Sequence, residues 1–264
     1  MDYKGLCDEV IGIAVEAGQY IMERMTGFSM NQVEVKGKNN FVTEVDKAAE
    51  GMIVERLRKL VNGAGFIAEE GTAQSRGEKY NWIIDPLDGT TNFIHHAPPV
   101  AVSIALTEND LPVIGVVYEV WLKEAFYAWK GGGAYLNGKE IRVSDTAEMK
   151  DALIAVGFPY HGEQRRRVFI QSLDHFLHAT HGVRRLGSAA TDLAYVACGR
   201  YEGFYEYNLA PWDVAAGAII ITEAGGKVSD FSGKNNFLFG KEIVASNNRV
   251  FAEFLNDVAQ FMKP

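Results

Sequence analysis

The sequence predicts an α+β or mixed α/β protein made of stacked helix and sheet layers. Three observations support this fold class. Apolar residues recur at helical spacing near both ends of the chain, strand patterns follow one another between Trp82 and Val143, and strand and helix patterns alternate beyond Asp145. The chain has 264 residues and no linker, internal repeat or low-complexity tract. We therefore expect a single domain over residues 1–264, with two fused lobes at approximately residues 1–145 and 146–264.

Two helices are predicted in the first quarter of the chain. The first runs from about Tyr3 to Met25, and the apolar residues that recur along it are Val10, Ile13, Ala14, Ala17 and Ile21. The second runs from about Thr43 to Leu60, and the apolar residues assigned to one side of it are Ala48, Met52, Ile53, Leu57 and Leu60. The polar stretch between them, residues 32–42, is expected to form a strand tip and a loop.

The middle of the chain is expected to form a largely antiparallel sheet. The segments at residues 100–106, 113–118 and 124–129 are short, rich in β-branched or aromatic residues, and separated by turn residues. Consecutive strands with short connections pair antiparallel. The run Lys130-Gly131-Gly132-Gly133 lies between two strand patterns, so we interpret it as a hairpin turn and not as a nucleotide-binding loop.

The last third of the chain alternates strand and helix. Ser188 is a good N-cap for a helix that continues to Cys198, and Gly199 is placed to end that helix. Further elements are predicted as a helix over residues 212–223, a strand over residues 243–246 and an amphipathic helix over residues 250–262.

Composition and charge exclude several classes of function. The net charge of −8 argues against nucleic acid as a partner, because binding a phosphate backbone requires clustered Lys and Arg. The one dense basic run, residues 165–167, is interpreted as a solvated surface. No stretch approaches the roughly 20 apolar residues of a membrane span, and the first five residues lack the pattern of a secretory signal. Cys7 and Cys198 are interpreted as buried small hydrophobes, so we expect a cytoplasmic protein without a membrane partner.

The segment Asp85–Phe93, Asp-Pro-Leu-Asp-Gly-Thr-Thr-Asn-Phe, carries the most informative chemistry. A short apolar run before it predicts a buried strand, so two carboxylates emerge where that strand ends, on a bend that Pro86 stiffens. Such a bend can point Asp85, the Leu87 carbonyl and Asp88 at a common centre. Oxygen ligands of this kind suit a hard cation such as Mg²⁺.

The second half of the same segment suits a phosphate. Gly89, Thr90 and Thr91 supply unhindered backbone N–H groups and two hydroxyls, which are the groups that bind phosphate in proteins. A metal site followed at once by a phosphate site indicates a phosphatase.

The Asp85–Phe93 segment also resembles the signature of the inositol monophosphatase family of Mg²⁺-dependent, Li⁺-sensitive sugar phosphatases. Residues 66–71 resemble the family's Glu-Glu metal-binding segment, and residues 42–46 its Thr-x-x-Asp segment. Residues 211–217 resemble its second signature, while Gly187 to Ala190 and Tyr205-Glu206 resemble the segments that contact its polyol. These motifs together, in family order, are a far more specific signal than any one of them. The resemblance implies the five-layer αβαβα sugar-phosphatase fold, Li⁺ inhibition and a homodimer.

The resemblance also implies a set of metal ligands. Asp85 is expected to bridge two Mg²⁺ ions, with Glu69 and the Leu87 carbonyl on one ion and Asp88 and Asp213 on the other. Two divalent ions about 3.5–4 Å apart can bind both the attacking and the departing oxygen of an in-line displacement. A third, looser ion is allowed, so two or three Mg²⁺ ions are expected in each active site.

Three residues are expected to assist the chemistry. By resemblance, Thr90 orients a water on the first ion, Asp46 hydrogen-bonds Thr90, and Glu70 orients water or holds the third ion. From the sequence alone, Asp46 has an equally good explanation as a carboxylate in the first turn of a helix.

The remaining expected site residues contact substrate. Gly89, Thr90 and Thr91 are assigned to the phosphate, and the residues assigned to the polyol hydroxyls are Gly187, Ser188, Ala189 and Glu206. Ser188 is also a helix cap, and Glu206 is alternatively a solvent-facing strand residue. Either Lys36 or Lys38 corresponds to a lysine on the family's metal-site loop, and the sequence does not distinguish them. Residues 157–167 have no counterpart, so we expect substrate preference to arise there.

The predicted function is Mg²⁺-dependent hydrolysis of a small polyol phosphate monoester, with myo-inositol monophosphate as the first choice. Residues 91–93 resemble the inositol and histidinol branch of the family more than its nucleotide or bisphosphatase branches. Two alternatives stay open. One is a histidinol-phosphate or fructose-1,6-bisphosphate phosphatase of the same fold, and the other is a regulatory relative that binds a protein partner.

Overall fold

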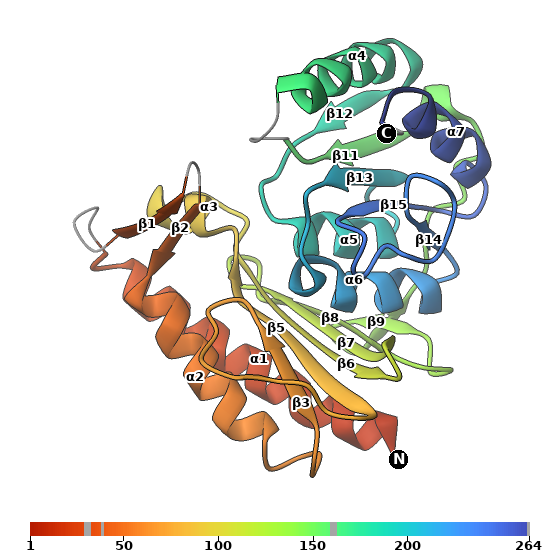
Figure 1. Cartoon of the computed structure of the whole chain (residues 1–264). Coiled ribbons are helices and arrows are strands. Elements are labelled where there is room, and N and C mark those ends of the chain that lie inside the picture. The colour runs from red at the N-terminus through yellow and green to blue at the C-terminus, as the bar shows by residue number, and fades with distance from the viewer. Residues whose placement is uncertain (29–32, 38–39, 159–162, 263–264) are drawn as a thin grey trace.

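The computed structural model describes residues 1–28, 33–37, 40–158 and 163–262, and of residues 33–37 and 40–43 it describes the backbone alone. Helices and sheets alternate in five layers (Figure 1). In order, the layers are α1 (Tyr3–Met25) with α2 (Glu44–Leu57), an eight-stranded sheet, α5 (Ala189–Ala197) with α6 (Pro211–Glu223), a five-stranded sheet, and α4 (Glu163–Ala179) with α7 (Phe251–Met262). The predicted fold class, a mixed α/β protein of αβαβα layers, is confirmed.

The eight-stranded sheet has the strand order β10-β9-β8-β7-β6-β5-β3-β4. Its strands are β3 (Gly65–Ala68), β4 (Gln74–Ser75), β5 (Tyr80–Asp88), β6 (Ala101–Glu108), β7 (Leu111–Glu119), β8 (Glu124–Trp129), β9 (Ala134–Leu136) and β10 (Lys139–Ile141). Strands β5 to β10 pair antiparallel in chain order, as predicted, and the three-glycine run is the turn between β8 and β9. Strand β3 is the exception, because it pairs parallel with β5.

The five-stranded sheet has the order β12-β11-β13-β15-β14. Its strands are β11 (Leu153–Val156), β12 (Gly182–Arg184), β13 (Gly203–Tyr207), β14 (Lys227–Ser229) and β15 (Glu242–Ser246). A separate two-stranded hairpin, β1 (Val33–Gly37) with β2 (Asn40–Thr43), stands where a strand tip and loop were predicted. Lys38 lies outside the described residues, as does the side chain of Lys36.

Successive side chains along a strand point to opposite faces of the sheet, so they pack into different hydrophobic cores. On β5, Ile84 faces α1 and α2, whereas its neighbour Ile83 faces α5 and α6. On β11, Ala155 joins the same central core, whereas Ile154 faces α4 and α7. Each sheet is therefore buried on both faces, which explains why its strands read as nearly continuous apolar runs.

The predicted helices occur close to their expected bounds, with one correction. All five apolar residues predicted for α1 are buried, and Ser188 and Gly199 flank α5 as expected. The predicted side of α2 is confirmed at Ile53 and Leu57, which are buried, and is wrong at Ala48, which is exposed. That helix buries Val45, Asp46, Ala49, Glu50, Ile53, Val54 and Leu57. An apolar pattern could not reveal this face, because two of its members are acids: Glu50 accepts hydrogen bonds from the loop after β3, and Asp46 lies within reach of the Thr90 hydroxyl on α3 (Thr90–Ile94).

Two smaller expectations, for the cysteines and for the basic run, have clear outcomes. Cys7 is buried and Cys198 half-buried, and both thiols are free. In the basic run, Arg166 and Arg167 are exposed on α4, but Arg165 is half-buried, with its guanidinium 4.5 Å from the centre of the Tyr207 ring. Over the described residues, no helix is long and apolar enough to cross a membrane.

Candidate active site

The acidic motif occupies a bulge inside β5, and the strand does not end before it as predicted. Asp85 pairs with Ser103 and Asp88 pairs with Ala101, so three steps along β5 face two steps along β6. In a regular strand, residues three apart point to opposite faces, and the extra residue of a bulge brings both acids to the same side. The Leu87 N–H, inside the bulge, donates to Asp85 Oδ1 at 2.9 Å and fixes that carboxylate.

Asp213 joins these two acids from the first turn of α6. The Ala210 N–H donates to Asp213 Oδ2 at 2.6 Å, which holds the side chain at the helix N-terminus. Asp85, Asp88 and Asp213 each offer one carboxylate oxygen, and these three oxygens lie within 4.8 Å of one another. Three of the predicted metal ligands therefore converge on one point.

Glu69, the fourth predicted carboxylate ligand, lies directly after β3 and beside Asp85. The Glu69 N–H continues the parallel pairing by donating to the Ile84 carbonyl at 3.2 Å. The Glu69 carboxylate is close enough to Asp85 to raise the pKa of Asp85 by repulsion and by a hydrogen bond. The parallel alignment of β3 with β5 is what brings these two strand ends together.

The N-terminus of α5 donates two hydrogen bonds to Asp88. The Ser188 hydroxyl donates to Asp88 Oδ2 at 2.6 Å, and the Ala190 N–H donates to the same oxygen at 2.7 Å. Ser188 Oγ also accepts the Thr191 N–H, so it caps α5 as predicted. The Ser188 side chain is buried, and it supports an acid of the cluster as well as the helix.

Burial and mutual repulsion destabilise the charged forms of these acids. Burial raises the pKa of Asp88 to about 6, against bonds from Ser188 and Ala190 that lower it. Burial and then repulsion by Asp88 raise the pKa of Asp213 to about 7. Burial, followed by repulsion from Glu69, Asp88 and Asp213, raises the pKa of Asp85 well above its usual range. A bound cation would relieve this repulsion, and an all-oxygen donor set fits a hard divalent ion.

Thr90 lies at the edge of the cluster, between two acceptors. Its hydroxyl is 3.4 Å from Asp46 Oδ1 and 3.2 Å from the Leu87 carbonyl. Thr90 begins the short helix α3 (Thr90–Ile94), and Gly89 before it has a φ of +96°. A Cβ at Gly89 would lie 2.8 Å from the Pro99 carbonyl, so the turn requires glycine. Asp46 is buried on α2, whereas Thr91 is exposed.

The predicted polyol residues lie across from α3. Asn92 donates to the carbonyls of Pro99 at 2.8 Å and Leu186 at 2.9 Å, and thereby ties α3 to the segment that precedes Gly187. Gly187 has a φ of +91°, and Ala189 is buried in the first turn of α5. The structure therefore brings the phosphate segment and the polyol segment side by side.

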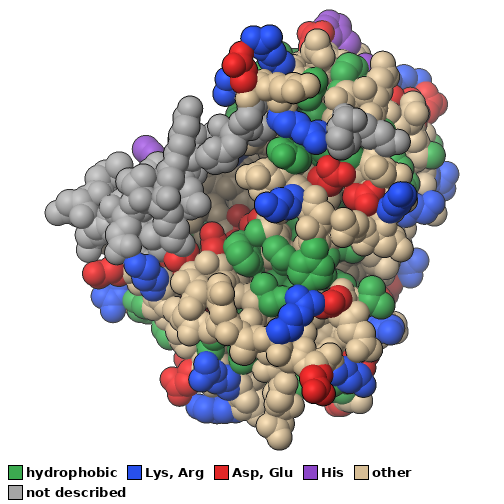
Figure 2. Space-filling view, viewed as in Figure 1, with side chains coloured by type: hydrophobic (Ala, Val, Ile, Leu, Met, Phe, Trp, Pro, Cys, Tyr) green, Lys and Arg blue, Asp and Glu red, His purple; other side chains and the backbone are tan. Residues whose placement is uncertain are grey.

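Glu206 on β13 faces the acid cluster and is not a solvent-facing strand residue. Burial, with repulsion from Asp213 and Asp88, raises the pKa of Glu206 to about 8. Its carboxyl group also packs against Gly157 at the end of β11, where an added Cβ would come within 1.7 Å of Glu206 Cδ. Figure 2 shows that this face of the protein is hollowed between its upper and lower parts, with Asp and Glu side chains inside the hollow.

Two buried acids beside the site were missed by the sequence interpretation. Glu50 lies one turn after Asp46 on α2, and Asp192 lies one turn after Ser188 on α5. Each of these acids follows a predicted site residue by four positions. Residues four apart lie on one face of a helix, so this spacing could have identified both acids. Of the segment expected to set substrate preference, residues 159–162 lie outside the described residues.

The chain is similar to known proteins over nearly its whole length. The sequence model described as "Inositol monophosphatase family" matches residues 5–263. Nus factor SuhB of Pseudomonas aeruginosa is 42% identical over 261 residues, which cover 95% of this chain and 94% of that relative. Inositol-1-monophosphatase of Mesorhizobium japonicum is 39% identical over 259 residues, covering 98% and 97%. The structure of inositol monophosphatase from Anabaena (Nostoc) sp. PCC 7120 has a TM-score of 0.87 and 35% identity, covering 99% of this chain and 98% of that one.

Proposed function

We propose that this chain, which belongs to the inositol monophosphatase family, is a Mg²⁺-dependent phosphatase of small polyol phosphate monoesters. The convergence of Asp85, Asp88 and Asp213 on one point, with oxygens within 4.8 Å of one another, supports this proposal most directly. Acids from β5 and α6 are brought together although they are far apart in the sequence. Burial and mutual repulsion raise their pKa values, and a bound cation would offset that repulsion.

The ligand sets are those that the family implies, and the convergence of Asp85, Asp88 and Asp213 supports the second set. Asp85, Glu69 and the Leu87 carbonyl would hold one Mg²⁺, and Asp85, Asp88 and Asp213 a second. Bound there, the ions would lower the pKa of a water and neutralise the oxygens of the transferred phosphoryl group. We assign the phosphate to the backbone N–H groups of Gly89, Thr90 and Thr91, which lie at the start of α3.

Thr90 and Asp46 would position the attacking water. If the Thr90 hydroxyl donates its proton to Asp46 Oδ1, 3.4 Å away, rather than to the Leu87 carbonyl, Thr90 Oγ is left as an acceptor for a proton of the water. Glu70 neighbours Glu69 and is assigned a supporting role with water or a third ion. In-line attack requires the water on the side of the phosphorus opposite the leaving oxygen, which is why its orientation matters.

A polyol would be recognised on the side of the site formed by α5 and β13. Glu206 can accept hydrogen bonds from the hydroxyls of the substrate, and Gly187 and Ala189 offer backbone groups next to it. A cyclic polyol phosphate such as myo-inositol monophosphate presents several hydroxyls to such acceptors. Histidinol phosphate has no free hydroxyl and fructose 1,6-bisphosphate carries a second phosphate, so we place inositol monophosphate ahead of both.

Phosphate release from a substrate panel tests the proposal. We expect Mg²⁺-dependent turnover that is highest with myo-inositol monophosphate, measured beside histidinol phosphate, fructose 1,6-bisphosphate and 3′-phosphoadenosine phosphates. A higher kcat/KM for another member of the panel would correct the substrate while leaving the reaction class in place. No turnover of any of these esters with Mg²⁺ or Mn²⁺ would overturn the enzyme proposal.

A regulatory role is the second candidate, and the 42% identity to Nus factor SuhB favours it. Such a role requires binding of a transcription complex, and we expect that binding to be independent of the acid cluster. Capture of purified transcription factors by both the wild-type chain and the Asp88→Asn variant would support a binding function separate from hydrolysis. The homodimer and the Li⁺ inhibition implied by the family stay predictions, which sedimentation and an inhibition assay would test.

A further inference from the structure

A fully buried acid on α2 holds the loop that carries Glu69. Glu50 has no exposed surface, and its carboxylate accepts three hydrogen bonds. The Glu70 N–H donates to Oε2 at 2.7 Å, while the Thr72 N–H and the Thr72 hydroxyl both donate to Oε1 at 2.7 Å. Charge-assisted bonds of this length are among the stronger ones in proteins.

The arrangement of the donors requires a carboxylate. Glu50 has two acceptor oxygens, and each of them faces a backbone N–H. A glutamine of the same shape has one acceptor oxygen and one amide group that only donates. Glutamine would therefore place an N–H against an N–H on one side and leave that buried donor without an acceptor.

These bonds hold the backbone that follows Glu69 in the chain. The Glu69 N–H itself is bound to the Ile84 carbonyl of β5. Beyond it the chain turns at Gly71, which has a φ of +73°, before β4 begins. The loop is therefore clamped immediately before and after the Glu69 carboxylate, between the sheet and α2.

The same helix face also reaches the other edge of the site. Asp46, one turn before Glu50, lies 3.4 Å from the Thr90 hydroxyl. Acids four residues apart on a helix lie on one face, so α2 contacts both the Glu69 loop and the start of α3. A shift of this helix would move a metal ligand and a water-positioning residue together.

We propose that Glu50 is a positioning residue that sets metal affinity by holding Glu69 in place. The inference rests on the proposed function, because it takes Glu69 as a ligand of the metal. Groups that support a metal ligand in this way typically change metal affinity or activity about 10–100-fold when they are replaced.

Calorimetric titration of the purified protein with Mn²⁺ tests the inference. We expect Glu50→Gln to raise the Kd for Mn²⁺ about tenfold or more. Thr72→Val, which removes only the hydroxyl bond, should raise it about threefold. Glu55→Gln is the matched control: Glu55 is an exposed acid on the same helix, paired with Lys59, and its replacement should leave the Kd unchanged. The kcat of Glu50→Gln should return to within about twofold of wild type at saturating Mn²⁺, which a general loss of structure would not allow.

The outcomes separate this inference from the proposed function. If the wild-type protein binds Mn²⁺ and Glu50→Gln binds it equally well, the role of Glu50 is wrong and the proposed function stands. If the wild-type protein binds no Mn²⁺, the metal-dependent function is wrong and the inference falls with it. If Glu50→Gln does not fold, Thr72→Val decides, because Thr72 is exposed on the loop. An unchanged Kd in Thr72→Val would then overturn the inference.

Discussion

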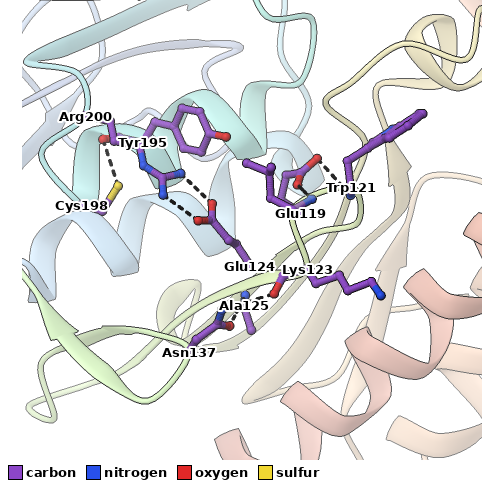
Figure 3. A network of polar contacts seen from close by, with 10 residues as sticks. Glu119, Trp121, Lys123, Glu124, Ala125, Asn137, Tyr195, Cys198 and Arg200 are labelled. Atoms are coloured by element: carbon purple, nitrogen blue, oxygen red, sulfur yellow. Dashed lines mark hydrogen bonds and ion pairs between the residues drawn. The ribbon is translucent and has the colours of Figure 1, made fainter.

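Two groups of charged side chains in this protein differ in how their charge is balanced. After α5, Arg200 donates to both oxygens of Glu124 on β8, each at 2.6 Å, and lies over the Tyr195 ring (Figure 3). In the candidate site, by contrast, three acids bring their oxygens within 4.8 Å of one another. One group contains both partners of an ion pair, and the other gathers charges of one sign.

The direction of the pKa shifts reflects this difference. The bond to Glu124 raises the pKa of Arg200, which favours its charged form. Burial raises the pKa values of Asp88 and Asp213, which disfavours theirs. The Glu124 network is complete within the chain and serves stability. The acid cluster destabilises the free protein, and a cation from solution would complete it.

The largest expected effect comes from removing one acid of the cluster. We expect Asp85→Asn to lower kcat/KM for a polyol phosphate at least about 10³-fold, because a metal site contributes several kcal/mol to the transition state. Asparagine keeps an oxygen for the Leu87 N–H and removes one of several like charges. The metal-free variant should therefore unfold at or above the wild-type temperature.

Phosphate-release kinetics and thermal unfolding monitored by circular dichroism check the two halves of this prediction. A variant that loses activity only in proportion to a loss of folded protein would contradict the account. So would a clear fall in the unfolding temperature of the metal-free protein, since it would mean that Asp85 stabilises the chain as Glu124 does.

The second expected effect is a dependence of metal affinity on pH. Burial raises the pKa of Asp88 to about 6 and that of Asp213 to about 7, so a metal that binds here would displace protons from these acids near those pH values. Metal affinity should therefore rise as the pH increases from 5.5 to 7.5, by about tenfold per pH unit for each proton displaced.

Calorimetry of Mn²⁺ binding in two buffers of different ionisation enthalpy measures the protons released. Equal heats in both buffers at pH 6, with a Kd that does not change with pH, would show that the acids are already ionised. The cluster would then resemble the balanced Glu124 network more than we infer.

The sequence predicted more of this site than of the elements that hold it. Carboxylates in a Pro- and Gly-containing segment and the family motifs identified Asp85, Asp88 and Asp213, because chemistry restricts which residues can stand there. The bulge in β5 was not foreseen, since pairing with β6 decides where a strand ends. Glu50 was missed for a related reason: a buried acid breaks the apolar pattern that marks a helix face, and its partners are backbone groups of a distant loop.

The third prediction tests the ion pair between Arg200 and Glu124. We expect Arg200→Met to lower the free energy of unfolding by about 1–2 kcal/mol, because it leaves the half-buried Glu124 without its partner. The turnover number should stay within about twofold of wild type, since this network does not contact the acid cluster. Arg142→Met is the control, because the Arg142–Glu140 pair is highly exposed and should contribute less than about 0.5 kcal/mol. Urea unfolding of the three proteins measures the difference, and equal losses in both variants would argue against it.

The smallest expected effect comes from moving the Glu206 carboxyl group without changing its charge. Gly157→Ala adds a Cβ where the Glu206 carboxyl group now lies, and the end of that flexible side chain must move away. The charge of the site is unchanged, so metal affinity should stay as in wild type. We expect the KM for myo-inositol monophosphate to rise about threefold, while the KM for an aryl phosphate, which has no polyol hydroxyls, stays constant. Glu206→Ala should show the same selectivity with a larger rise, whereas Gly12→Ala on α1, where an added Cβ meets nothing within 4 Å, should change neither value. Equal rises for both substrates would mean that Glu206 acts on the phosphate end of the site, and the polyol would then have to be recognised elsewhere.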